Sequence, residues 1–108
     1  MKKDNRYVEP NMSISRITAK GQITNLSNGF ELKGGAFFSI YVRPKTLTTL
    51  ERDAIISCQL YGDNQCSDVP VPLFAWCELC ITKIAPSSTL LNSYDIYWGA
   101  GIVDYQTN

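Results

Sequence analysis

A chain of 108 residues, 44% hydrophobic and 19% charged, is long enough for one globular domain with a modest core and too apolar to be disordered. Ten basic residues balance ten acidic ones, so no net field exists that would concentrate nucleic acid or an anionic membrane. Histidine is absent, which removes the commonest general base and every zinc site that depends on imidazole.

The N-terminal segment predicts an arm followed by a first strand. Residues 1–11 are polar and predict an extended arm, and residues 12–108 predict a single β domain. Residues 13–19 are rich in β-formers, but their alternation slips between Ile14 and Ile17, as a β-bulge would make it. We therefore expect an irregular strand at the start of the domain.

Glycine-containing turns divide the next stretch. Gly21 predicts a turn, and Ser-Asn-Gly at residues 27–29 predicts another, which leads into a short extended piece at residues 30–32. The glycine pair at residues 34–35 predicts a further reversal of the chain. Short elements joined by tight turns are typical of a small antiparallel fold.

The two clearest strands are residues 37–43 and 54–61, in which apolar side chains alternate with mixed ones. One face of each strand is therefore expected to lie in the core. These core positions are Phe38, Ile40 and Val42 on the first strand, and Ala54, Ile56, Cys58 and Leu60 on the second.

The last third of the chain predicts three further extended segments. Val-Pro-Val-Pro at residues 69–72 indicates an edge strand or a connector, because proline cannot donate to a ladder. Residues 74–84 predict a strand, and residues 94–98 predict a long last strand that the glycines in residues 99–101 would kink. About seven short strands without a helical apolar period predict a small all-β domain, either a sandwich or a barrel.

The stretch from Trp76 to Cys80 resembles the Trp-Cys-x-x-Cys redox site of thioredoxins. That chemistry needs the first cysteine at the N-terminus of a helix, where the helix dipole favours the thiolate. Here the residues after Cys80 are β-branched and stop at Pro86, so no helix is expected. A thiol oxidoreductase that uses Cys77 and Cys80 is therefore the least favoured function.

Four cysteines also allow a zinc site or a disulfide. Metal knuckles usually place a Cys-x-x-Cys pair beside a turn residue, and none accompanies Cys77 and Cys80. Cys58 stands in an apolar alternation, and free cysteine is among the most buried residue types. We predict that all four cysteines, Cys58, Cys66, Cys77 and Cys80, are structural free thiols, and we predict no metal and no cofactor.

Tyrosine and tryptophan are concentrated near the C-terminus. Such rings stack on bases or sugars. Stacking on bases usually requires interleaved Lys and Arg residues, and the last 25 residues contain neither. Core packing or a protein interface is the favoured interpretation, and a sugar platform made of Tyr94, Tyr97 or Trp98 is the alternative. The set comprises Tyr94, Tyr97, Trp98 and Tyr105, together with Tyr41 and Tyr61.

A short basic cluster in the arm suggests a contact with a neighbouring subunit. Lys2, Lys3 and Arg6 could pair with carboxylates there, while Tyr7 and Val8 supply apolar contact. The residues that we predict for protein interfaces are thus those five, together with Tyr94, Tyr97, Trp98 and Tyr105.

Four local patterns carry a resemblance to a known class. They are Pro-Leu-x-x-Trp at residues 72–76, Ile-x-x-Ile-x-Pro at 81–86, the leucine pair 90–91, and Tyr-Asp-Ile-Tyr-Trp-Gly-Ala at 94–100. Together they resemble small auxiliary or decoration capsid proteins of crAss-like tailed bacteriophages. That resemblance implies a β domain without enzymatic activity that binds a capsid lattice.

The leading expectation is therefore a non-enzymatic structural virion protein, assembled in the host cytoplasm and bound to capsid or other virion subunits. A homo-oligomer is possible, and neither nucleic acid nor a membrane is expected as a partner. No secretory signal or run of 18 apolar residues is seen in the sequence. The alternatives are a carbohydrate-binding β-sandwich module and, less favoured, the thiol oxidoreductase.

Overall fold

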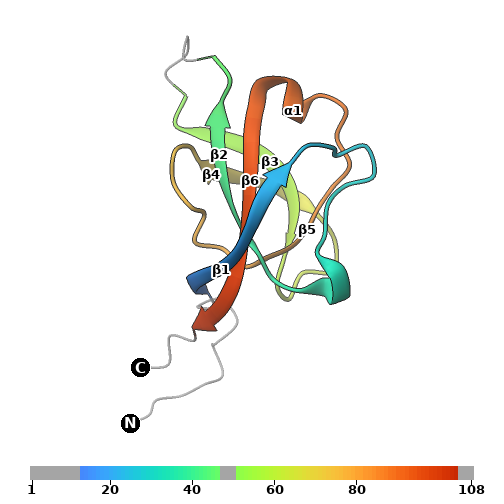
Figure 1. The fold of residues 1–108 in the computed structure, drawn as a ribbon. Coiled ribbons are helices and arrows are strands. Elements are labelled where there is room, and N and C mark those ends of the chain that lie inside the picture. Colours follow the sequence, from blue (N-terminus) through green and yellow to red (C-terminus); the bar gives the residue numbers. More distant parts are fainter. Residues whose placement is uncertain (1–12, 47–50, 105–108) are drawn as a thin grey trace.

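The computed structural model describes residues 13–46 and 51–104, which form six strands and little helix (Figure 1). The helical pieces are a short 3₁₀ turn at Lys33–Gly35 and a single α-helical turn, α1 (Leu90–Ser93). The strands are β1 (Ser13–Ile23), β2 (Ser39–Pro44), β3 (Asp53–Leu60), β4 (Ser67–Pro72), β5 (Ile81–Ile84) and β6 (Tyr94–Asp104).

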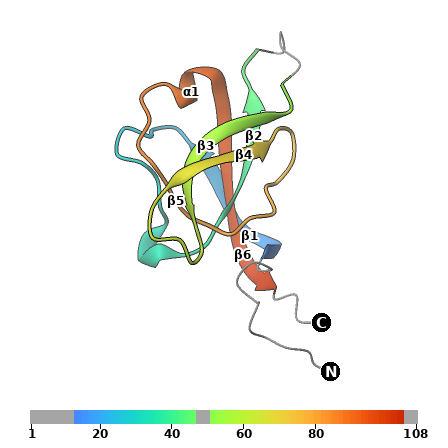
Figure 2. The same ribbon diagram turned by 180° about the vertical axis from the view of Figure 1, so that it is seen from behind.

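The strands form two three-stranded antiparallel sheets, with the orders β1-β6-β2 and β4-β3-β5. Figure 1 shows the first sheet in front, and the reverse view in Figure 2 brings β3 and β4 forward, so the sheets form two layers. Isolated bridges from Phe38 to Ile81 and from Phe30 to Ile84 connect the layers along β5. The all-β prediction is confirmed.

One hydrophobic core fills the space between the layers, and the predicted alternation accounts for most of it. Leu60 is only partly buried and packs against this core, whereas the other six predicted core positions are fully buried. Ile23, Ile81, Ile84 and Ile96 complete the centre from β1, β5 and β6. The fully buried predicted positions are Phe38, Ile40, Val42, Ala54, Ile56 and Cys58.

Two irregularities of strand structure were predicted correctly. The pairing of β1 with β6 shifts register between Ile14 and Arg16 and again between Ile17 and Ala19, which confirms a bulged first strand. The prolines of β4 lie on an edge strand, because β4 pairs with β3 alone within the described residues.

Several boundaries were predicted wrongly. The described residues form six strands rather than seven, because residues 74–80 are irregular and only Ile81–Ile84 of that segment forms a strand. Gly21 does not turn the chain, since it pairs with Trp98 inside β1, and β6 continues in one piece through Gly99. The predicted arm, residues 1–11, lies outside the described residues.

No helix in the described part of the chain has the length and apolar character that crossing a membrane requires.

Candidate functional site: an aromatic hollow on the outer face

A row of polar and aromatic side chains crosses the outer face of the first sheet. Tyr97 of β6 lies opposite Tyr41 of β2 and Gln22 of β1 in the two ladders. Their neighbours Val42 and Ile96 are buried, so by the alternation of a strand this row faces away from the core. Three strands therefore place three outward-facing side chains side by side.

The segment after β4 adds a tryptophan to this row. It runs along the outer edge of β2, where the Phe74 and Cys77 amides donate to the carbonyls of Val42 and Ile40 at 2.9 and 2.8 Å. The buried Ser39 hydroxyl donates to the Cys77 carbonyl and anchors the same segment to β2. Trp76 is thereby held beside Tyr41 and remains 37% exposed.

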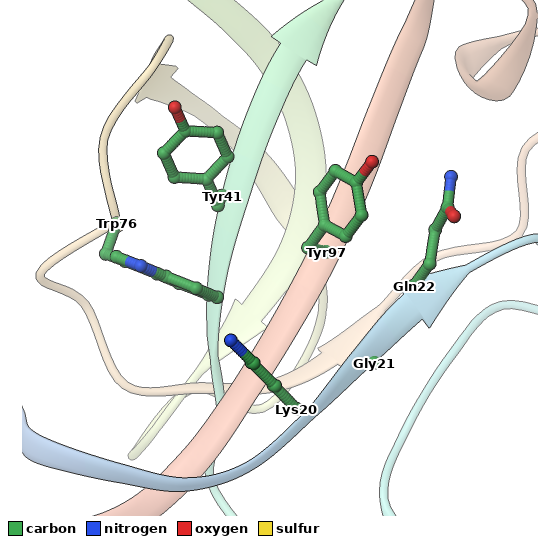
Figure 3. A pocket seen from close by; sticks show the side chains of 6 residues that line it. All are labelled: Lys20, Gly21, Gln22, Tyr41, Trp76 and Tyr97. Carbon is green, nitrogen blue, oxygen red and sulfur yellow. The ribbon is translucent and has the colours of Figure 1, made fainter.

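These side chains surround an open hollow of about 520 Å³ (Figure 3). The ring centroids of Tyr41 and Trp76 are 5.6 Å apart, and those of Tyr41 and Tyr97 are 6.5 Å apart. Figure 3 shows Lys20 extending from β1 toward the Trp76 ring, with Gln22 beyond Tyr97. The lining residues are Lys20, Gly21, Gln22, Tyr41, Trp76 and Tyr97, one cation and no carboxylate.

A charged cluster borders the hollow beyond Tyr97. Asp95 lies 3.0 Å from the Lys45 ammonium and 3.4 Å from the Arg43 guanidinium. These cations, Lys45 first, hold the pKa of the Asp95 carboxyl below its ordinary value. Arg43 also donates to the Tyr97 hydroxyl at 3.2 Å and lies 5.8 Å from that ring's centroid, which fixes Tyr97 from its far side.

The structure separates the aromatic residues that the sequence grouped. Tyr97 lines the hollow, whereas Tyr94 and Trp98 pack against the core on the opposite face of β6. These three rings therefore do not share one surface, and of the three it is Tyr97 that lines the hollow. Tyr94 instead donates to the Glu51 carboxylate at 2.8 Å, and this bond raises the pKa of the tyrosine.

The other predicted interface residues lie outside the described part of the chain. They are Lys2, Lys3, Arg6, Tyr7, Val8 and Tyr105.

The sequence reasoning missed Trp76 and Tyr41 as partners in one site. Tyr41 stood on the predicted outer face of its strand, which was a usable signal. Trp76 could not be placed, because a regular strand over residues 74–84 would have carried it elsewhere. Its neighbour across the sheet, Gly99, leaves the room that the indole ring occupies.

The cysteines are free thiols, and three of them are buried. Burial raises the pKa of Cys77 and of Cys80, which disfavours the thiolate that redox chemistry needs. Burial, followed by nearby Cys77 and Cys66, raises the pKa of Cys58 to about 12. The residues after Cys80 form a strand, so the helix of a thioredoxin-like site is missing at that position.

Within the described residues, no group of three or more Cys, Asp or Glu side chains has the arrangement of a metal site. Among the described residues, the hollow offers an open lining of aromatic and polar side chains that is suited to contact another molecule. In comparisons with known proteins, no family model, no curated protein and no solved structure matches the chain.

Proposed function

We propose that this chain is a non-enzymatic structural subunit of a tailed-phage virion, which decorates the capsid by binding neighbouring subunits through the outer face of β1-β6-β2. The resemblance of residues 76–100 to small capsid proteins supports the virion context. The aromatic hollow is the observation that carries the binding role.

Aromatic rings held rigidly at a surface are suited to bind protein. Tyr and Trp dominate interface energetics because they bury a large area at a small cost in side-chain entropy. Here Arg43 restrains Tyr97, and the main-chain bonds on either side of Trp76 restrain the indole. The rings are therefore organised before a partner arrives, which lowers the entropic cost of binding.

Two steps test the proposal. Mass spectrometry of purified phage particles from cells that carry the gene should find the chain at a fixed ratio to the major capsid protein. Tyr97→Ala, in the hollow, should then reduce incorporation about tenfold or more, as loss of an interface anchor does. Tyr61→Ala, which removes a 40% exposed tyrosine outside the hollow, is the matched control and should incorporate normally. Particles without the chain would contradict the proposal.

A second candidate is a carbohydrate-binding domain, favoured by the placement of Trp76 and two tyrosines around one hollow with Gln22 and Lys20 on its rim. The rings would stack on a pyranose, and the amide and ammonium groups would bond its hydroxyls. Titration with neutral and acidic oligosaccharides while tryptophan fluorescence is recorded tests it. A saturable change that Trp76→Phe abolishes would favour this candidate over the capsid role.

A further inference from the structure

In the part of the chain that the structure describes, strand β1 is the open edge. At the other end of its sheet, β2 is bonded to the segment that carries Phe74 and Cys77. In the second sheet, β5 exchanges bonds with Phe30, at 2.8 and 3.0 Å. Within residues 13–46 and 51–104, β1 pairs with β6 alone and contains no proline.

The remaining edge, β4, is blocked by its sequence. The Leu73 amide, directly after β4, donates to the Arg52 carbonyl, on the side of β3. Because peptide groups alternate in direction along a strand, those of Pro70 and Pro72 point away from β3. Both residues lack an N–H group, so this edge cannot support a regular ladder.

The direction of the β1 peptide groups follows from the bonds across the sheet. The carbonyls of Ile40 and Val42 point away from β6, so Tyr41 is the residue that bonds to β6, opposite Tyr97. The next residue of β6, Trp98, then bonds in the other direction, to Gly21. The main-chain groups of Lys20 and Gln22 must therefore point out of the sheet, to the open edge.

The regular part of this edge is symmetric. Ala19 to Ile23 pair with β6 without a register shift, and the bulge between Ile17 and Ala19 ends the regular stretch on one side. Gly21 is the midpoint of these residues. The two outward-facing residues, Lys20 and Gln22, lie at equal distances on either side of it.

We propose that two copies of this chain pair antiparallel along β1, with Gly21 of one copy opposite Gly21 of the other. Lys20 of each copy then exchanges both main-chain hydrogen bonds with Gln22 of its partner, and the first sheets become one continuous sheet. The Lys20 ammonium also meets the Gln22 amide oxygen across the strands, a favourable cross-strand pair.

Charge selects this register over its neighbours. Centring the pair on Lys20 would set two ammonium groups opposite each other, and like charges directly opposite are destabilising. Centring it on Gln22 would move the pairing past Ile23, where β1 ends. The chain has no net charge, so two copies do not repel each other as a whole.

The dimer brings two aromatic hollows onto the same outer face, because Lys20 and Gln22 belong both to the open edge and to the lining. The proposed dimer does not depend on a role in a virion. A result that contradicts the dimer would therefore leave the proposed function standing, and a result that contradicts the proposed function would leave the dimer standing. The regular stretch is short, and the dimer is expected to be weak, with a dissociation constant at or above about 1 μM.

Disulfide trapping tests the register. Lys20→Cys and Gln22→Cys are made separately in a Cys66→Ser background, so that the remaining native thiols are buried. An equal mixture of the two variants under mild oxidation should give covalent heterodimers at least about tenfold faster than either variant alone, since the register sets residue 20 opposite residue 22. Absence of heterodimers, or equal rates in all three samples, would overturn the proposal.

A proline variant tests the role of the main chain. Gln22→Pro removes an outward N–H group without touching the bonds to β6, whereas the matched variant Gln22→Ala keeps it. In sedimentation equilibrium, Gln22→Pro should raise the dissociation constant about tenfold or more, and Gln22→Ala by less than about threefold. Dimerisation of Gln22→Pro as tight as that of the unmodified chain would overturn the proposal.

Discussion

The indole of Trp76 lies directly over Gly99, across two strands of the first sheet. A Cβ atom at position 99 would lie 3.1 Å from Cζ3 of Trp76 and 2.8 Å from Cδ1 of Ile17. Position 99 falls on the outer face, like Tyr97, yet it is buried, and the side chains of Ile17 and Trp76 lie closest to it. The hollow therefore depends on a glycine in the middle of a long strand.

Gly99→Ala should displace the Trp76 ring and open the hollow. The added methyl group overpacks the contact, which costs about 1–3 kcal/mol of unfolding free energy. Acrylamide quenching of tryptophan fluorescence should increase, and the melting temperature should fall. In a Trp76→Ala background the same substitution should cost less, because one of the two crowding groups is gone. An equal cost in both backgrounds would show that Ile17 alone is responsible.

Neighbouring isoleucines on β3 provide a matched test of the core. Ile56 is fully buried, whereas Ile55 is 59% exposed on the opposite face of the strand. Ile56→Ala should cost about 2–5 kcal/mol, since it leaves a cavity in the core. Ile55→Ala should change stability by no more than about 0.5 kcal/mol. Urea unfolding of both variants measures the difference, and similar costs would mean that the faces of β3 are assigned incorrectly.

The alternation of apolar and polar residues was the sequence feature that predicted the structure best. In residues 37–43 and 54–61 the predicted core positions repeat every second residue, and burial follows that repeat except at Ser39, which is buried and bonded to the Cys77 carbonyl, and at Leu60, which is only partly buried. The bulge in β1 could be predicted for the same reason, because a slipped alternation marks the residue that leaves the ladder. A local sequence pattern is sufficient to assign the buried face of a strand when one face of that strand packs against the core.

The site could not be predicted in the same way, because long-range contacts define it. Trp76 is held by bonds from its neighbours to β2, more than thirty positions earlier in the chain. Gly21 suggested a turn, yet it is needed inside a strand, where a Cβ would lie 2.8 Å from Nε1 of Trp98. A glycine that makes room for a ring and a glycine that turns the chain look alike in sequence.

The Asp95 cluster makes a prediction about pH. Since its pKa is lowered in the folded chain, the stability from this carboxylate is present above its ordinary pKa of 3.8 and is lost as the pH falls through the lower folded value. Carboxyl titration by NMR should place the Asp95 midpoint below 3.8. Lys45→Gln should raise that midpoint more than Arg43→Gln does, because Lys45 makes the closer contact. The reverse order would contradict this assignment.

The thiols should differ in accessibility. Cys66 is half-exposed, whereas Cys58, Cys77 and Cys80 are buried. A disulfide reagent at neutral pH should therefore modify Cys66 first, and the other three only as the chain unfolds. In the Cys66→Ser variant the fast phase should disappear. A fast reaction at a second thiol would contradict the buried placement.

The raised pKa of Cys58 should also reduce stability in alkali. Its ordinary value is 9.0 and its folded value is about 12, so the folded chain keeps the proton over a range in which the unfolded chain loses it. Stability from this thiol is complete below pH 9.0 and declines as the pH rises toward 12. Urea unfolding between neutral pH and pH 11 should show a steeper decline for the unmodified chain than for Cys58→Ala. Cys58→Ala is less stable at neutral pH because of the cavity it leaves, and parallel declines would show that Cys58 ionises in the folded state as readily as in the unfolded one.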